Sequence, residues 1–211
     1  MKNKIDHFAI GADTLEQGVA AMESLLGVTV PKGGKHDAMS THNHVMQSGN
    51  ESFFELIAID PDAPDPGRTR WFTLDDSATQ TRLAERPRAL CWVVGTDDLD
   101  AVVAASPIDL GEVVLFTRGD RSWRLTVPKD GSLPMAGLVP AFIEWSPGPH
   151  PSTGQQNLGV MLDKVQLRTP DPEALNAVLS ALNVSHLCEV NEGAQALAFD
   201  LATPVGPVTL D

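Results

Sequence analysis

The chain has 211 residues and a formal net charge of −13, because 28 acidic side chains outnumber 15 lysines and arginines. Such an acidic surface repels phosphate backbones and anionic lipids, so we expect neither nucleic acid nor a membrane as a partner. No apolar run approaches the roughly 20 residues that span a bilayer, and the charged N-terminal residues are followed by no apolar segment typical of a signal peptide. Cys91 and Cys188 have no metal-binding spacing. We therefore expect a cytoplasmic protein with reduced thiols.

Two stretches of the chain repeat one another. Residues 10–21 and 94–105 share Gly, Asp, Leu, Val and two Ala at a constant offset of 84 (94 − 10 = 84). Each stretch follows a short apolar run, a pattern that predicts a strand leading into a helix. Asp13 and Asp97 are the predicted N-caps, and Gly27 is the predicted stop of the first helix.

Strand-like segments follow each predicted helix. Polar turn residues separate them, and Gly33-Gly34 reads as an ordinary loop. Strands are predicted at residues 41–47 and 52–59 of the first copy, around the turn Ser48-Gly49-Asn50-Glu51, and at residues 112–116, 122–127 and 138–145 of the second. Each copy therefore reads as a βαβββ module.

A third, shorter copy is predicted near the C-terminus. A strand at 162–167 precedes a helix that ends near residue 183, with Pro172 in its first turn. Three short strands follow. The sequence then divides into a first module (1–60), a connecting insert (61–87), a second module (88–146), a linker (147–160) and a third module (161–211). The third module has no mate in the chain, so it either packs against the first two or pairs with a second copy in a homodimer.

Two modules that face one another would enclose a concave sheet with a shared cleft. His7 on the first strand and Glu55 on the last are the polar candidates of the first module, and Cys91 and Glu144 take the corresponding places in the second. These groups could hold a divalent metal or act as a general acid and base. Strand alternation places each glutamate opposite its apolar neighbours, on a face that is either the cleft or the solvent.

Several motifs together resemble the glyoxalase-like family of the vicinal-oxygen-chelate superfamily. The resemblance covers residues 4 to about 151 and extends more weakly to 211. It implies an α+β fold of tandem βαβββ modules that form curved mixed sheets with helices outside. Its motifs are residues 5–10, Ser40-Thr41-His42-Asn43, residues 53–57, Thr117-Arg118, Trp123-Arg124-Leu125, Phe142-Ile143-Glu144-Trp145 and His150-Pro151.

The resemblance also implies a ligand set. His7, Glu55 and Glu144 occupy the metal-ligand positions of the superfamily and are the predicted catalytic residues, with Mn, Fe, Ni or Zn as the expected metal and otherwise no cofactor. Cys91 stands where the superfamily has a second histidine. This departure leaves open whether a full metal site exists and whether the thiolate takes part.

The predicted substrate-binding residues come from the same motifs. The alternative is that the polar ones fix loops or pair with surface charges. On the resemblance we expect an isomerase, a lyase or a dioxygenase acting on a small oxygen-rich molecule, and the alternative is a non-catalytic binding protein of the bleomycin-resistance type. The residues predicted to bind the substrate are His42, Asn43, Arg118, Trp123 and Arg124.

Overall fold

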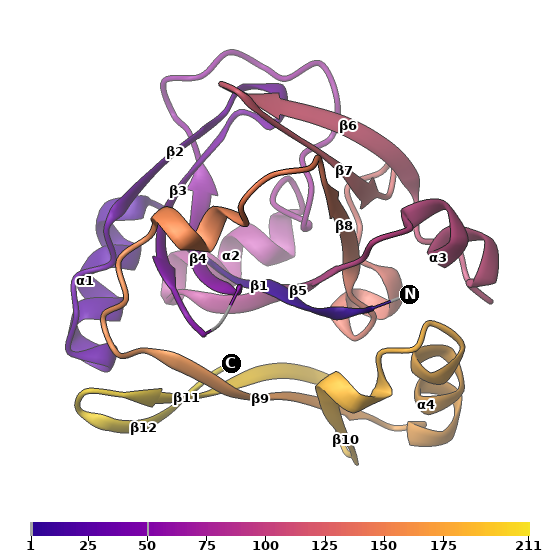
Figure 1. Ribbon diagram of the computed structural model, residues 1–211. Coiled ribbons are helices and arrows are strands. Elements are labelled where there is room, and N and C mark those ends of the chain that lie inside the picture. The colour runs from indigo at the N-terminus through magenta and orange to yellow at the C-terminus, as the bar shows by residue number, and fades with distance from the viewer. Residues whose placement is uncertain (1, 50) are drawn as a thin grey trace.

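The computed structural model describes residues 2–49 and 51–211 and contains two β-sheets (Figure 1). The first module comprises β1 (Lys4–Gly11), α1 (Leu15–Leu26), β2 (Lys32–His36), β3 (Thr41–Gln47) and β4 (Phe53–Ile59). After α2 (Ser77–Glu85), the second comprises β5 (Arg88–Gly95), α3 (Leu99–Ala105), β6 (Glu112–Arg118), β7 (Arg121–Val127) and β8 (Ala141–Trp145). The third comprises β9 (Met161–Thr169), α4 (Pro172–Ala181), β10 (Cys188–Glu192), β11 (Ala196–Thr203) and β12 (Gly206–Leu210).

The first two modules build one eight-stranded sheet in the order β2-β3-β4-β1-β5-β8-β7-β6. In each module the first strand pairs in parallel with the last, β1 with β4 and β5 with β8, and β1 and β5 join the modules by antiparallel pairing. The sheet curls so that its two edge strands, β2 and β6, approach each other, while α1 and α3 lie outside (Figure 1). The predicted fold class of curved mixed sheets is confirmed.

Both repeat helices begin one residue later than predicted. The N-cap of α1 is Thr14, whose side chain accepts a hydrogen bond from Gln17 N, and the N-cap of α3 is Asp98. Asp13 precedes the cap, and its backbone N–H donates to Gln17 Oε1, so the Gln17 side chain bonds back toward the start of the helix. The offset of 84 between the modules is kept (98 − 14 = 84), and Gly27 ends α1 in the left-handed conformation as predicted.

The sequence missed one strand. Gly33 and Gly34 lie in β2, which pairs with β3, so the predicted loop is wrong. Glycine has a low strand propensity and gives no apolar alternation. Here the missing side chains let the neighbouring strand's Asn43 come close, since a Cβ on Gly33 would lie 2.2 Å from Asn43 Oδ1.

The third module has the predicted order of elements but a different pairing of strands. Its sheet runs β10-β9-β11-β12, so β9 lies between β10, its parallel partner, and β11, its antiparallel partner. In the first two modules, by contrast, the second strand lies at the far edge of the module from the first. The helix α4 therefore makes a local crossover between adjacent parallel strands, as in a βαβ unit.

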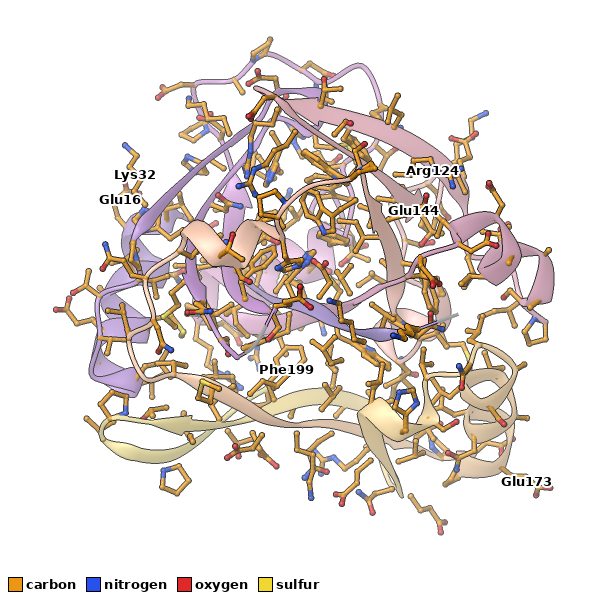
Figure 2. The ribbon with its side chains drawn as sticks, viewed as in Figure 1. Glu16, Lys32, Arg124, Glu144, Glu173 and Phe199 are labelled. Carbon is orange, nitrogen blue, oxygen red and sulfur yellow. The ribbon has the colours of Figure 1, made fainter. Side chains whose placement is uncertain are left out.

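The third module packs against the back of the eight-stranded sheet. Phe199 of β11 is fully buried between the two sheets (Figure 2), and its ring lies 4.9 Å from that of Phe8 in β1. The helices α1, α3 and α4 contribute to the same core, which includes Leu26, Leu99 and Leu175. Of the two arrangements that the sequence left open, the chain therefore adopts packing against its own first two modules.

A second core covers the opposite face of the eight-stranded sheet. The connection between β4 and α2 supplies Trp71 and Phe72 to this core, beside Phe116 and Trp123 of the second module. The rings of Trp71 and Phe72 are stacked at 5.2 Å. This aromatic face contains the candidate site. Among the helices that the structure describes, none is long and apolar enough to cross a membrane.

Candidate functional site

A small pocket lies on the face of the eight-stranded sheet opposite the third module. Strands of both modules and the segment before α2 form its walls. Aromatic side chains dominate, and the polar groups are few: they include a histidine pair, one carboxylate and one guanidinium. These polar lining residues are His7, His36, Asn43, Glu55, Arg118 and Gln155.

His7 and its neighbour Asp6 form the polar centre of the site. Their side chains meet, with His7 Nδ1 2.6 Å from Asp6 Oδ1. Adjacent strand residues ordinarily point to opposite faces, but the pairing of β1 with β5 shifts by one residue between Ile5 and His7. Such a bulge turns a side chain away from strict alternation. The bulge therefore lets Asp6 bind Nδ1 of the His7 ring while Nε2 of the same ring faces Glu55.

Asp6 is buried, and its carboxylate contacts nitrogen atoms of three side chains. Its Oδ2 accepts a hydrogen bond of 2.7 Å from Trp145 Nε1 and lies 3.0 Å from His150 Nε2, while its Oδ1 contacts His7. Burial alone opposes ionisation of Asp6, but the hydrogen bonds and charges of His150 and His7 outweigh it and lower the pKa of Asp6 to about 2. Asp6 is therefore a permanent buried anion at neutral pH.

Glu55 faces His7 across the pocket wall. Its Oε2 lies 3.7 Å from His7 Nε2, and its Oε1 accepts a hydrogen bond of 2.6 Å from Asn43 Nδ2. Asn43 is itself fixed, since its Oδ1 accepts from the backbone N–H of Gly34 at 2.8 Å. One oxygen of Glu55 is thus anchored while the other remains directed toward the imidazole.

The environment of His7 favours its charged form. Burial of the ring opposes protonation, but the hydrogen bond to Asp6 and the charges of Asp6 and Glu55 outweigh it and raise the pKa of His7 above its ordinary value of 6.5. The ring also stacks on Phe53, with centroids 4.5 Å apart. His7 is therefore an oriented donor at the pocket wall and holds its proton more tightly than a free histidine.

We expect Gly33→Ala to lower the free energy of unfolding by about 1–3 kcal/mol, the usual cost of overpacking. The new Cβ would collide with Asn43 Oδ1, which must then release Gly34 N or Glu55. Gly34→Ala is the matched control, because its Cβ would lie 3.3 Å from the flexible end of Arg118. Urea denaturation of both variants measures the difference, and equal stabilities would contradict this role of Gly33.

Glu144 does not join this site. In β8, Ile143 and Trp145 line the pocket, so alternation turns Glu144 to the other face. There Glu144 Oε2 accepts hydrogen bonds from Leu99 N at the start of α3 and from Arg124 Nη2, at 2.9 and 2.7 Å. Figure 2 shows Arg124 and Glu144 together beside α3. The predicted convergence of Glu144 with His7 is therefore wrong, and Arg124 likewise lies outside the pocket because it alternates with Trp123.

Two further predicted residues, His42 and Cys91, do not line the pocket. His42 alternates with Asn43 in β3, and its Nδ1 lies 4.0 Å from Asp60 on the opposite face. Cys91 is on the pocket side of β5 but is buried among apolar side chains, and burial raises the pKa of its thiol well above 9.0. Cys91 is therefore a neutral, packed side chain, whereas metal ligation requires a thiolate. The structure does bring His7, Asn43, Glu55, Arg118 and Trp123 to one pocket.

The arrangement does not fit a divalent metal held by three protein ligands. His7 and Glu55 are the donors that face each other, and no group of three histidine, cysteine, aspartate or glutamate side chains with metal-ligand geometry occurs in residues 2–49 and 51–211. Glu144, the third predicted ligand, is paired with Arg124 outside the pocket. We therefore assign no step of the chemistry below to a metal.

Sequence reasoning missed several residues of the pocket. No sequence pattern marks His36, which enters the pocket from the unpredicted strand β2. Trp145 was not predicted as a site residue, because the motif that contains it pointed to its neighbour Glu144. Trp71-Phe72 had one signal, an aromatic pair within an otherwise polar, proline-rich insert. His150 belongs to the motif His150-Pro151 but was not predicted as a site residue, and it contacts Asp6 across 144 positions of the chain.

Comparison with known proteins supports the fold and the family. The glyoxalase-like domain family matches residues 5–183. A crystal structure of a hypothetical protein from Staphylococcus aureus is similar over 99% of this chain and 84% of its own, with 15% identity and a TM-score of 0.64. Methylmalonyl-CoA epimerase from Mycobacterium tuberculosis is 17% identical over 69% of this chain and 88% of its own, with a TM-score of 0.43. No curated protein matches the sequence. The chain belongs to the glyoxalase-like domain family, and its fold is that of the vicinal-oxygen-chelate superfamily.

Proposed function

We propose that this protein is an isomerase-type enzyme that moves a proton on a small oxygen-rich molecule, at a carbon next to a carbonyl or carboxylate group. The observation that carries the proposal is the line of side chains Asp6, His7 and Glu55 at the wall of a largely aromatic pocket. A carboxylate facing an oriented imidazole supplies both a base and an acid.

Each group has one role in the proposed reaction. Glu55 accepts the proton through Oε2, while Asn43 fixes its other oxygen. The electron pair of the broken C–H bond moves to the neighbouring carbonyl oxygen and forms an enolate. The Nε2–H of protonated His7 donates a hydrogen bond to that oxygen, and the proton then returns to carbon at a new position or on a new face. No oxidant or reductant is required.

The pocket strengthens these interactions. Trp71, Phe72, Trp123 and Trp145 exclude water from the polar groups. In such surroundings a preorganised donor stabilises developing negative charge far better than it does in water. Asp6 keeps the His7 ring in one orientation, with Nδ1 engaged and Nε2 free for the substrate.

The donor set favours proton transfer over oxygen insertion. Non-haem iron oxygenases hold their iron by two histidines and a carboxylate with open positions. Within the described residues, His7 and Glu55 have no third side chain with suitable geometry. Lyase chemistry that begins with the same proton removal uses the same two residues and is a variant of the proposal.

A non-catalytic binding function is the second candidate. The aromatic density of the pocket favours it, since five phenylalanine and tryptophan side chains and few polar groups are typical of a site that binds a ligand by apolar contact. It predicts binding without exchange of any carbon-bound proton, which distinguishes it from the isomerase.

Proton NMR in D₂O tests the proposal. A panel of chiral 2-oxo, 2-hydroxy and 2-substituted carboxylic acids is incubated with the protein, and loss of the signal of the proton next to the carboxylate or carbonyl is followed. We expect exchange with at least one member, and we expect it to persist after dialysis against EDTA because no proposed step uses a metal. Binding of panel members without exchange would support the second candidate instead.

A further inference from the structure

Arg118 carries a positive charge at the pocket that no described side chain neutralises. Among the described residues its guanidinium forms no ion pair, and its recorded side-chain contact is His36 Nε2, 3.4 Å from Nη1. Arg70 and Arg124, by contrast, are both paired with carboxylates. Arg118 is exposed at the pocket, and it is the one arginine or lysine among the residues that line it, so its charge is available to an anion that enters.

His36 cannot compensate this charge. Burial is the main cause that lowers the pKa of His36 to about 4, so the ring is neutral at physiological pH. Its Nδ1 lies 3.1 Å from Thr41 Oγ1, and its Nε2 is directed at Arg118. A neutral imidazole orients the guanidinium and leaves its charge available for an anion.

Planar aromatic surfaces make up the rest of the pocket. Three of the four tryptophans of the chain, Trp71, Trp123 and Trp145, border it. Trp123 contacts Trp145 at a centroid distance of 5.2 Å. Indole faces offer large, rigid contact areas to a flat ring.

One buried polar atom in the pocket wall also lacks a partner. Trp71 Nε1 is inaccessible to solvent and makes no hydrogen bond within the described chain, although Trp71 lines the pocket. An unpaired buried donor costs about 1–3 kcal/mol. The Trp71 indole is therefore held in the pocket wall by ring packing on Phe72 and Phe116 rather than by a hydrogen bond.

We infer that the pocket takes a carboxylic acid with an aromatic body, whose carboxylate pairs with Arg118 and whose ring packs against the tryptophans. The inference rests on the proposed function in taking this pocket as the substrate site, and it names the substrate class. The inferred substrate class agrees with the proposed proton transfer. A carbon that lies between an aromatic ring and a carboxylate is more acidic than an aliphatic one, because the ring delocalises the electron pair left by the proton. Such a carbon is suited to removal of its proton by Glu55.

Tryptophan fluorescence gives a direct test, since three of the four indoles border the pocket. The purified protein is titrated with 2-phenylpropanoate, with propanoate and with 2-phenylpropan-1-ol, which separate the ring from the charge. We expect 2-phenylpropanoate to bind at least about 10-fold more tightly than either of the others, because a hydrogen bond to a charged group contributes about 1.5–3 kcal/mol. Equal affinities for the acid and the alcohol, or for the two acids, would overturn the inference.

Arginine variants test which side chain binds the carboxylate of the ligand. Arg118→Gln should weaken the binding of 2-phenylpropanoate by about 10- to 100-fold and leave the alcohol unaffected. Arg124→Gln is the matched control, because that arginine pairs with Glu144 and Asp100 outside the pocket. An unchanged affinity in Arg118→Gln, with a melting temperature equal to that of the wild type, would refute the assignment.

The binding test is independent of turnover. Tight, Arg118-dependent binding without proton exchange would refute the proposed catalysis and uphold the substrate class. Exchange on an aliphatic acid, without preferential binding of the aromatic one, would uphold the catalysis and refute the class.

Discussion

Glu55→Gln is expected to reduce the rate of proton exchange in the pocket by about 10²- to 10⁴-fold, the usual contribution of a general base. Glutamine keeps the size of the side chain and an acceptor for Asn43 but cannot take a proton. The affinity for a bound acid should change little, because Glu55 acts on the carbon and not on the carboxylate. Exchange rates in D₂O under saturating ligand, together with fluorescence titrations, separate the two effects.

The chain offers a matched control for this variant. Glu144 is also a strand glutamate with a hydrogen-bonded carboxylate, but it faces α3 and Arg124 rather than the pocket. Glu144→Gln should leave the exchange rate within a few-fold of the wild type. If both variants lose activity equally, or if neither does, Glu55 is not the base.

Asp6→Asn is expected to lower the free energy of unfolding by about 3–5 kcal/mol, the usual cost of removing one partner from a buried charged network. Asp6 is 1% exposed and contacts His7, His150 and Trp145. Asparagine is nearly isosteric, but its amide nitrogen would oppose one of these donors, and His7 would lose the charge that favours its protonation. Asp100→Asn is the control, because that carboxylate is on the surface and its ion pair with Arg124 contributes only about 0–1 kcal/mol.

The pH dependence of this loss follows from the two pKa shifts. The folded pKa of Asp6 is about 2, below its ordinary value of 3.8, so its contribution is present above about pH 4 and is lost as the pH falls toward 2. The folded pKa of His7 is raised, so its contribution is complete below pH 6.5 and is lost as the pH rises through the folded value. Urea denaturation should therefore show the largest difference between wild type and variant near pH 5 to 6. A difference that does not change between pH 3 and pH 9 would contradict this account.

The repeat at offset 84 was sufficient to predict the tandem modules. The end of the first helix at Gly27 is confirmed, and β3 has the predicted bounds, Thr41–Gln47. The elements that were not predicted are those whose sequences have no apolar pattern. The strand β2 contains Gly33-Gly34 and is held by its pairing with β3, which no local signal reveals.

The site shows the limit of strand alternation as an argument. The rule applies equally to Glu55 and Glu144, and in both cases it turns the glutamate away from its two neighbours. For Glu55 those neighbours, Phe54 and Leu56, point into the core shared with the third module, so Glu55 faces the pocket. For Glu144 they line the pocket, so Glu144 faces outward. A single sequence shows which residues of a strand share a face, but it does not show which of the two faces lines the pocket.

The sequence by itself determined the local order of this protein, that is, its modules and most of its strands and helices. It also gave the candidate site residues that reach the pocket, which are His7, Asn43, Glu55, Arg118 and Trp123. Only the tertiary structure decided which of the predicted residues meet. The reason is physical, because the phase of β8, the bulge at Asp6 and the close approach of Asn43 to Gly33 depend on pairing between segments far apart in the chain. The pairing of β9 with β10 in the third module, and the packing of that module on the back of the sheet, depend on long-range contacts in the same way.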